Sequence, residues 1–334
     1  MKHSNISIFV SHEGCPNKCA FCNQHTISGH KSLPDADDVK EICNNALRQV
    51  SDKKNCEIAF FGGSFTAINR EYMISLLETA SQFVGEEKFK GIRISTRPDC
   101  IDEEVLEVLK KYKVSAIELG AQSMSDEVLF LNDRGHTADD VKNASQLIKS
   151  YGFELGLQMM TGLYGSDTET DSKTADEIIK LKPDTVRIYP TVILENTRLA
   201  ELYRSGIYKP YEFDKAVVLC AELLMRFEKE NIRVIKLGLH ASELVEGEMI
   251  GGFYHPAFRE LCEGEIFKKK ISELLFDGNF PCKSATVAIN PKNISKAVGQ
   301  NRKNLNYFMN KGVELKIQPD DKLLDRDVIL IEKR

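Results

Sequence analysis

Strand-like and helix-like stretches alternate over roughly the first 240 residues of this 334-residue chain. The strand-like stretches are short apolar runs, and most are followed by a segment with helical periodicity. The apolar runs are Ile6–Val10, Ile58–Phe61, Ile92–Ser95, Ala116–Leu119, Phe153–Met160 and Thr185–Tyr189. The helical segments are Asp37–Gln49, Arg70–Val84, Asp102–Tyr112, Ala138–Tyr151 and Ser172–Lys180. This alternation predicts an α/β fold with parallel strands, either a partial or full β/α barrel or a doubly wound sheet.

The pattern changes near residue 250. Helices at Thr197–Arg204 and Phe213–Glu230 and a strand at Arg233–Leu237 precede Gly251–Gly252 and His255–Pro256, which indicate a turn or linker. We therefore predict one domain over residues 1–250 and a small C-terminal α/β accessory domain over 251–334. The elements expected in the accessory domain are a helix at Ala257–Leu275, a strand at Ser284–Ile289, a helix at Ile294–Met309, and strands at Val313–Gln318 and Asp327–Glu332.

The composition predicts a cytoplasmic protein with no membrane partner. The net charge is −5, which does not by itself indicate nucleic-acid binding. An apolar run of about 18 residues is missing, and Met1–Ser11 lacks the features of a secretory signal. Thiols stay reduced in the cytosol, so the nine cysteines are not expected to form a disulfide framework. Six of them are scattered and are interpreted as small core residues, whereas three lie close together and indicate a metal site.

The three clustered cysteines, Cys15, Cys19 and Cys22, follow the first predicted strand. Thiolates at Cys-x3-Cys-x2-Cys spacing can ligate three irons of a [4Fe–4S] cluster from one loop. The fourth iron then stays open to bind the amino and carboxylate groups of S-adenosylmethionine, and Phe21 is a candidate for packing against its adenine. The alternative is a structural zinc site with His12 or His25 as the fourth ligand, although no second cysteine pair completes it.

Candidate cofactor-binding residues follow the later strands, where a β/α barrel carries its active site. Gly62, Gly63 and Ser64 end the second strand, and their backbone can approach the amino group of S-adenosylmethionine closely. Arg97, after the third strand, is a cation suited to a carboxylate or a phosphate. Further polar candidates lie at the ends of the fourth to sixth strands: Gln122, Ser123, Gln158 and Tyr189. Each of these residues either faces a ligand or only packs behind the site, and both alternatives stay open.

The cysteine loop and the Gly62–Gly63 motif resemble the radical-SAM superfamily. A longer similarity, over roughly residues 5–240, is to the catalytic subunit of Elongator and its bacterial relatives. It is carried by Thr96–Asp99, Glu118–Ser123, Arg134–Thr137, Met159–Leu163, Ile188–Thr191 and Tyr208–Tyr211. The resemblance implies a partial (β/α)6 barrel, a [4Fe–4S] cluster, S-adenosylmethionine, an electron donor such as reduced flavodoxin or ferredoxin, and a tRNA-like substrate. Elongator's subunit differs in its wider cysteine spacing and its acetyltransferase domain, which we do not expect in this chain.

The C-terminal segment resembles a type II KH module around residues 282–320. Ile294–Leu305 is similar to the helix–loop–helix with which such modules clamp a nucleic-acid backbone. Cys282–Ile317 holds seven Lys or Arg and one acidic residue, Glu314. The RNA-binding candidates are Lys296, Gly299, Arg302 and Lys303. Arg302 stands where the Gly-x-x-Gly clamp has its second glycine, so a solvated basic face without RNA-binding function is the alternative.

Three functions are consistent with these features. The leading hypothesis is a radical-SAM enzyme that modifies RNA, with no residue assigned as the general base. The first alternative is a radical-SAM enzyme for a small carboxylated molecule, similar to oxygen-independent coproporphyrinogen oxidases. The second is a non-enzymatic RNA-binding iron–sulfur protein.

Overall fold

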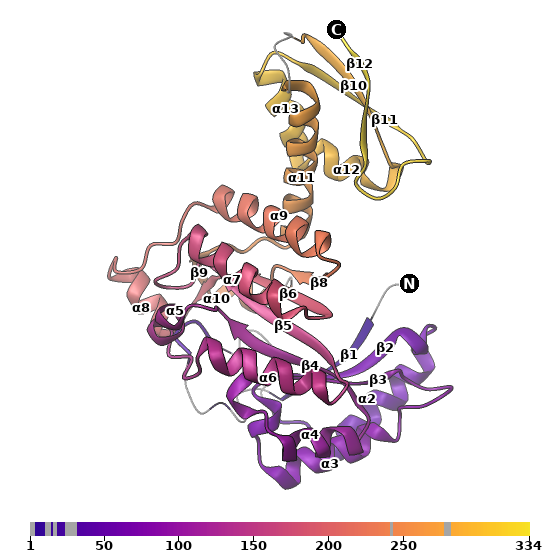
Figure 1. Ribbon diagram of the computed structural model, residues 1–334, viewed down its shortest axis with the longest axis vertical. Helices are drawn as coiled ribbons and strands as arrows, with labels where there is room; N and C mark the ends of the chain where they lie inside the picture. The colour runs from indigo at the N-terminus through magenta and orange to yellow at the C-terminus, as the bar shows by residue number, and fades with distance from the viewer. Residues whose placement is uncertain (1–3, 11–14, 16–18, 24–31, 241–242, 277–281) are drawn as a thin grey trace.

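A computed structural model describes residues 4–10, 15, 19–23, 32–240, 243–276 and 282–334. Its largest element is a seven-stranded sheet in the order β1-β2-β3-β4-β5-β6-β8, in which every neighbouring pair is parallel (Figure 1). The strands are β1 (Ser4–Val10), β2 (Cys56–Gly62), β3 (Gly91–Thr96), β4 (Val114–Gln122), β5 (Glu154–Thr161), β6 (Thr185–Pro190) and β8 (Arg233–Leu237). The α/β fold with a partial barrel is confirmed, and Arg233–Leu237 extends the six expected units by a seventh parallel strand.

Helices cover the outer face of this sheet (Figure 1). They are α2 (Ala36–Gln49), α3 (Arg70–Ser81), α4 (Glu103–Lys111), α6 (Ala138–Ser150), α7 (Thr168–Leu181) and α9 (Phe213–Lys229). Alternate strand residues such as Ile94, Leu119 and Leu157 belong to the core beneath these helices. The residues between them, such as Arg93 and Glu118, point to the other side of the sheet. A parallel sheet buried on both faces has nearly continuous apolar strands, so the alternation marks a polar concave face.

Side-chain caps start the helices where the sequence predicts. Asp102 accepts from the backbone N–H of Val105, and Thr137 forms a capping box with Asp140. Each cap satisfies an N–H group that has no partner inside the helix. Within the described ranges, none of the helices is long and apolar enough to cross a lipid bilayer.

Several shorter elements complete the barrel portion. Helix α8 (Arg198–Arg204) matches its predicted range, whereas α5 (Asp126–Leu131) and α10 (Glu243–Glu248) were not expected. Strand β7 (Val192–Leu194) pairs antiparallel with β9 (Met249–Gly252), which corrects the interpretation of Gly251–Gly252 as a turn. The backbone of Gly252 lies so close to Thr191 and Val192 that a Cβ atom there would collide with both.

A smaller sheet with its own apolar core forms the C-terminal region. Its order is β11-β10-β12, with β10 (Ser284–Ile289) parallel to β11 (Glu314–Pro319) and antiparallel to β12 (Val328–Lys333). The predicted helix at Ile294–Met309 is broken into α12 (Ile294–Val298) and α13 (Lys303–Asn310). The break is a short 3₁₀ turn in which Asn301 and Arg302 have φ of 52° and 60°, outside the right-handed helical region.

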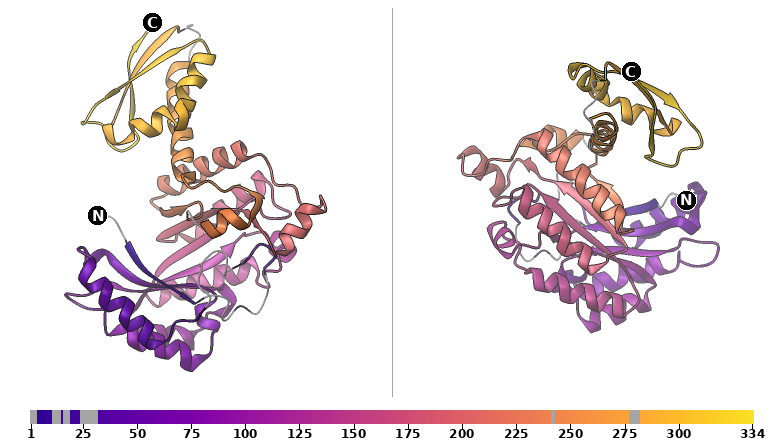
Figure 2. Two further views of the ribbon diagram at one scale, coloured as in Figure 1. Left: turned by 180° about the vertical axis from the view of Figure 1, so that it is seen from behind. Right: turned by 45° about the horizontal axis from the view of Figure 1, so that its top comes forward.

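Helix α11 (Phe258–Phe276) connects the barrel to the C-terminal region (Figure 2). Its first half, through Cys262 and Ile266, belongs to the core of the barrel. Its second half, through Phe267, Ile271 and Leu275, belongs to the core of the smaller sheet. The division of the chain at residue 250 stays a prediction.

Candidate functional site

The cysteine loop lies at the carboxyl end of the large sheet. The sulfur of Cys15 is 3.7 Å from the hydroxyl of Ser64, which follows β2. Arg134 donates from Nη1 to the sulfur of Cys19 at 3.0 Å and from Nη2 to the carbonyl of Gly120 in β4 at 2.8 Å. Among the motif cysteines, Cys15 is exposed and Cys19 and Cys22 are half-buried. Cys15 and Cys19 are therefore held at the ends of two strands.

The motif thiols are a donor set that an iron–sulfur cluster can use, because a cubane takes one thiolate on each iron. Among the described residues, no three Cys, His, Asp or Glu side chains converge on one point. A guanidinium beside one sulfur also suits a ligand that must carry negative charge. His12 and His25, the candidates for a zinc ligand, lie outside the described residues.

The glycines after β2 join the first two strands at this edge. The N–H of Gly63 donates to the carbonyl of Val10 at 2.8 Å, and Gly62 is the register partner of Val10. Gly62 has a φ of 116°, a conformation that glycine adopts readily. Ser64 is buried next to Cys15. These residues lie close to the cysteine loop, as their predicted role requires.

Arg97 is not a free cation. It is almost fully buried, and its Nε and Nη2 donate to the two carboxylate oxygens of Asp99 at 2.9 and 2.8 Å. Burial works against its charge, but the hydrogen bond and charge of Asp99 raise the pKa of Arg97 overall. Asp99 thus takes two of the five N–H donors of this guanidinium, and binding of a carboxylate or phosphate ligand by Arg97 stays a prediction.

Gln122 and Gln158 meet at the end of β4 and β5, but Ser123 does not join them. The amide of Gln158 donates to Gln122 Oε1 at 2.7 Å. The hydroxyl of Ser123 lies 3.2 Å from that of Thr174 in α7 and accepts from the N–H of Ser125. The side chain of Ser123 thus contacts the helix layer, and its cofactor-binding role stays a prediction.

Phe21 and Tyr189 share a small apolar cluster near the cysteine loop. Both pack, partly buried, against Val128, Met160 and Leu163. Phe21 also contacts a second small cluster that includes Leu199 and Tyr208. The backbone of Ala20 bridges Asn132 and Leu199, and it thereby anchors this part of the loop. The two aromatic rings are thus brought together as candidates for contact with an adenine.

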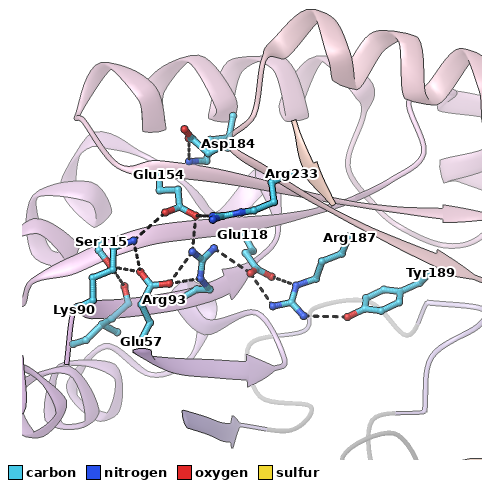
Figure 3. A network of polar contacts seen from close by, with 12 residues as sticks. Glu57, Lys90, Arg93, Ser115, Glu118, Glu154, Asp184, Arg187, Tyr189 and Arg233 are labelled. Atoms are coloured by element: carbon cyan, nitrogen blue, oxygen red, sulfur yellow. Dashed lines mark hydrogen bonds and ion pairs between the residues drawn. The ribbon is translucent and has the colours of Figure 1, made fainter. Parts of the chain in front are cut away.

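A buried network of charges occupies the concave face below these residues (Figure 3). Arg93 of β3, which is fully buried, donates to three carboxylates on β2, β4 and β5. Its partners are Glu57 at 2.8 Å, Glu118 at 3.2 Å and Glu154 at 2.6 Å. Burial would raise the pKa of Glu154, but the Arg93 guanidinium lowers it overall.

The network continues toward the carboxyl edge through Arg187. Glu118 pairs with Arg187 at 2.6 Å, and Arg187 donates to the hydroxyl of Tyr189 at 3.3 Å. The guanidinium of Arg187 also lies over the ring of Phe61, 4.9 Å from its centre. Burial opposes the charge of Arg187, but Glu118 raises its pKa overall. Tyr189 is therefore oriented by a chain of charges that crosses the inner face of the sheet (Figure 3).

Sequence reasoning missed Glu57, Arg93 and Glu154. The available signal was a charged residue between two buried apolar ones in several strands of a parallel sheet, such as Arg93 between Ile92 and Ile94. Such charges are expected on a face that is not covered by helices.

The four RNA-binding candidates lie around the break between α12 and α13. Lys296 pairs with Glu263 of α11 at 2.6 Å, and Lys303 pairs with Asp214 of α9 at 2.9 Å. Both lysines thus pair with other parts of the chain, the Lys303 pair at the surface, whereas Arg302 is exposed. The RNA-binding role of these residues stays a prediction. Gly299 lies against Asn304 and Gly264, where a Cβ atom would be crowded.

Comparisons with known proteins identify the family. The chain matches the radical SAM superfamily model over residues 9–178 and the radical SAM C-terminal domain over residues 183–268. It is 30% identical over 252 residues to the tRNA uridine(34) acetyltransferase of Methanocaldococcus jannaschii, covering 64% of this chain and 47% of the relative. It is also 30% identical over 188 residues to Elongator complex protein 3 of Saccharomyces cerevisiae, covering 50% and 34%.

The chain thus spans about half of the length of the first relative and a third of the second. Among solved structures, the archaeal Methanocaldococcus infernus Elp3 with an N-terminal deletion is similar in fold, with a TM-score of 0.65 at 22% identity over 81% of this chain and 64% of that one. Streptococcus suis SuiB bound to S-adenosylmethionine has a TM-score of 0.52 at 16% identity over 73% and 52%. The chain therefore belongs to the radical SAM superfamily, whose enzymes use a [4Fe–4S] cluster and S-adenosylmethionine.

Proposed function

We propose that this enzyme holds its cluster with Cys15, Cys19 and Cys22 and modifies an RNA, with a tRNA-like molecule as the substrate. The observation that carries the proposal is the position of the cysteine loop, which contacts Ser64 and Arg134 at the carboxyl edge of the parallel sheet. Active sites of β/α barrels lie at this edge. When bound, the cluster supplies the electron that cleaves S-adenosylmethionine to a 5′-deoxyadenosyl radical.

The chain's own residues would bind and orient S-adenosylmethionine. Backbone groups of Gly62 and Gly63 are the candidates for its amino group, and Phe21 and Tyr189 for its adenine. The amide pair of Gln122 and Gln158 offers donors and acceptors for its ribose or for the substrate. The concave face below supplies fixed dipoles and charges around the radical's path, and the apolar cluster at Phe21 keeps water away.

Two features support RNA as the substrate. The relatives named tRNA uridine(34) acetyltransferase act on tRNA by name and share the barrel portion of this chain. The C-terminal region supports the same proposal with a KH-like helix–loop–helix between two parallel strands. An electron donor such as reduced flavodoxin or ferredoxin and a cytoplasmic location complete the proposal, because the cluster needs reduced thiols and a supply of electrons.

The cluster assignment is tested by anaerobic reconstitution of single cysteine variants. Cys19→Ala should lose the iron–sulfur absorbance and the formation of 5′-deoxyadenosine. Cys100→Ala is the matched control, because Cys100 is a half-buried thiol that follows β3 at the same edge of the sheet. Retention of a full cluster by Cys19→Ala would contradict the assignment, and an intact cluster that never cleaves S-adenosylmethionine would favour an RNA-binding iron–sulfur protein.

The substrate class is tested by incubating reconstituted enzyme with bulk tRNA in deuterated and ordinary form. Transfer of deuterium from RNA into 5′-deoxyadenosine, together with a changed nucleoside mass after digestion, is the expected result. If 5′-deoxyadenosine forms without any RNA-dependent change, a small carboxylated substrate becomes the better hypothesis.

A further inference from the structure

A groove lies between the helical loop of the C-terminal region and the barrel. It consists of two cavities of about 390 and 600 Å³ that share Leu261, Gln300 and Asn301 in their walls. The smaller cavity is lined by α11 on one side and by the segment from Ser295 to Arg302 on the other. The larger is lined by Phe213 and His255 of the barrel portion and by Tyr307 and neighbouring residues of α13. The groove therefore exists only where both parts of the chain meet.

Ion pairs hold the loop in this position. Lys296 is bound to Glu263 and Lys303 to Asp214, so two cations that a free KH-like loop would present to a phosphate chain are directed at the barrel instead. A third pair, between Arg326 and Glu228 at 2.6 Å, links the end of the chain to α9. Arg302 is exposed and lines the smaller cavity, as does Glu260 of α11. The loop is thus better arranged to close a groove than to clamp a backbone.

The walls of the larger cavity combine aromatic rings with side-chain amides. The rings are those of Phe213, His255 and Tyr307, and the amides come from Gln300, Asn301, Asn306 and Asn310. Proteins bind unstacked RNA bases by stacking them on aromatic side chains and by hydrogen bonds to their edges. Asparagine and glutamine each supply a donor and an acceptor for those edges. A volume of about 600 Å³ also lies in the range of small-ligand pockets.

We propose that this groove holds an unpaired nucleotide of the RNA substrate, with its base in the larger cavity and a phosphate at Arg302. The inference rests on the proposed function and adds a site formed jointly by the barrel and the C-terminal region. Lys296 and Lys303 also line the cavities, but they are paired with Glu263 and Asp214, and Glu260 adds a negative charge to the smaller cavity. Because Arg302 is then the main cation for a phosphate, base contacts supply most of the affinity.

The test measures binding of a fluorescein-labelled oligouridylate to the full chain by fluorescence anisotropy. Phe213→Leu removes a ring from the barrel side, and Asn306→Ala removes an amide from the opposite side. Each should weaken binding roughly tenfold, as expected for loss of a base contact. Arg302→Gln should weaken binding and reduce the slope of log affinity against log salt by about 0.7, the value for one phosphate of a single strand.

Lys316→Gln is the matched control, because Lys316 is an exposed cation of β11 that lines neither cavity. It should leave the affinity within twofold of the wild type. His255→Asn is a second barrel-side variant if Phe213→Leu does not fold, as judged by circular dichroism. An RNA duplex of the same length should bind more weakly than the single strand, since its bases are not available to the cavity.

Sensitivity to Arg302→Gln without any effect of the barrel-side variants would overturn the joint groove, because the C-terminal region would then bind RNA alone. RNA affinity unchanged in all groove variants, the result expected if the groove takes a peptide instead, would also overturn it while leaving the RNA substrate in place. Failure of the wild type both to bind oligouridylate and to act on tRNA would remove the RNA substrate and the groove together. The formation of 5′-deoxyadenosine reports separately whether the cluster site is intact.

Discussion

Arg134 connects the cysteine loop to the sheet through one buried guanidinium. It donates to the sulfur of Cys19 and to the carbonyl of Gly120, and only 6% of the residue is exposed. Hydrogen bonds to the sulfur atoms of an iron–sulfur cluster and nearby positive charge both raise its reduction potential. Arg134 is thus a positioning residue that acts on the cluster through one of its proposed ligands.

We expect Arg134→Gln to lower the reduction potential of the reconstituted cluster and to weaken cluster retention roughly 10- to 100-fold. The potential is measured by an anaerobic redox titration followed by electron paramagnetic resonance, and retention by iron content after gel filtration. The control is Arg198→Gln, which removes an exposed arginine paired with Asp133. An unchanged potential in Arg134→Gln would show that the contact with Cys19 has no electronic effect.

Arg93 is the residue whose removal should cost the most stability. Arg93→Met would leave Glu57, a fully buried carboxylate, without its guanidinium partner. Breaking a buried ion pair in this way typically costs about 3–5 kcal/mol. Arg70→Met removes an exposed ion pair with Glu104 and should cost at most about 1 kcal/mol. Urea unfolding of both variants gives the comparison, and equal losses would contradict the role of burial.

His136 should make the folded state sensitive to acid. Its Nε2 lies 3.2 Å from the carbonyl of Ala121, and burial together with the charge of Arg134 lowers the pKa of His136 to about 4. Between pH 6.5 and 4 the unfolded chain therefore binds a proton that the folded chain does not, so stability falls as the pH falls. From pH 7 to pH 5 this contributes a loss of about 2 kcal/mol.

The measurement is the urea midpoint of wild type and His136→Gln at both pH values. The variant should be less stable at pH 7 but should lose less between pH 7 and pH 5. A wild-type pH dependence that His136→Gln leaves intact would assign the acid sensitivity to other groups.

At the scale of elements, the turn between β5 and α7 is held by one buried carboxylate. Asp171 accepts from the N–H of Gly162 at 2.8 Å and from the hydroxyl of Tyr211 at 3.0 Å. Burial raises the pKa of Asp171 to about 6. Tyr208 donates to the carbonyl of Gly162 at 2.5 Å. Both tyrosines of the Tyr208–Tyr211 motif therefore hold the turn that follows β5.

Gly162→Ala should disrupt this turn. Gly162 has a φ of 72°, and a Cβ atom there would collide with the ring of Phe253. Gly152, with a φ of 83° and open space where a Cβ atom would lie, is the matched control. We expect Gly152→Ala to cost about 1–2 kcal/mol from backbone strain alone. Gly162→Ala should cost about 1–3 kcal/mol more from overpacking, and thermal unfolding that ranks the two variants equally would contradict this assignment.

The strands and most helices of the barrel were predictable because their signals are local. Apolar runs, helical periodicity and caps such as Asp102 and Thr137 all lie within a few residues of the elements they define. The pairing of β7 with β9 was not predictable, because it joins short segments far apart in the chain and depends on the close approach at Gly252. The break between α12 and α13 was expected from the resemblance to a helix–loop–helix but not from helical periodicity, since Asn301 and Arg302 adopt positive φ although neither is glycine.

In the candidate site, too, local sequence signals were predictable and contacts between distant residues were not. The cysteine spacing and the residues after each strand indicate where the chemistry takes place. The partners of those residues are set by the fold, as with Asp99 for Arg97, Thr174 for Ser123 and Glu263 for Lys296. A sequence names the charged side chain, but the three-dimensional neighbours decide whether that charge is still available to a ligand.

At the scale of the whole molecule, Glu263 is a buried residue through which ion pairs connect α11 to the C-terminal region. It is buried in α11 and pairs with Arg259, Lys296 and Arg326. Burial would raise the pKa of Glu263, but Lys296 and Arg259 lower it overall. Its charge therefore holds together cations from the helix, the helical loop and the end of the chain.

Glu263→Gln should loosen the C-terminal region without unfolding the barrel. Loss of the buried partner of three cations should lower stability by about 3 kcal/mol. This loss should reduce the free energy of local opening of residues 284–334. Hydrogen exchange measured by mass spectrometry should rise there and stay unchanged in β4. Glu265→Gln, at a neighbouring position of α11 that pairs with Lys268, is the control. A uniform rise in exchange across the chain would mean that Glu263 stabilises the whole fold instead.

Because helix α11 contributes to both cores, we expect it to impose an order of assembly during synthesis. The ribosome releases the barrel strands first, yet the barrel core is incomplete until Cys262 and Ile266 have emerged. Once the first half of the helix docks, its second half presents Phe267 and Ile271 as a ready-made apolar surface. We therefore expect the strands of the C-terminal region to pack on a helix that the barrel has already docked, so that the C-terminal region folds after the barrel.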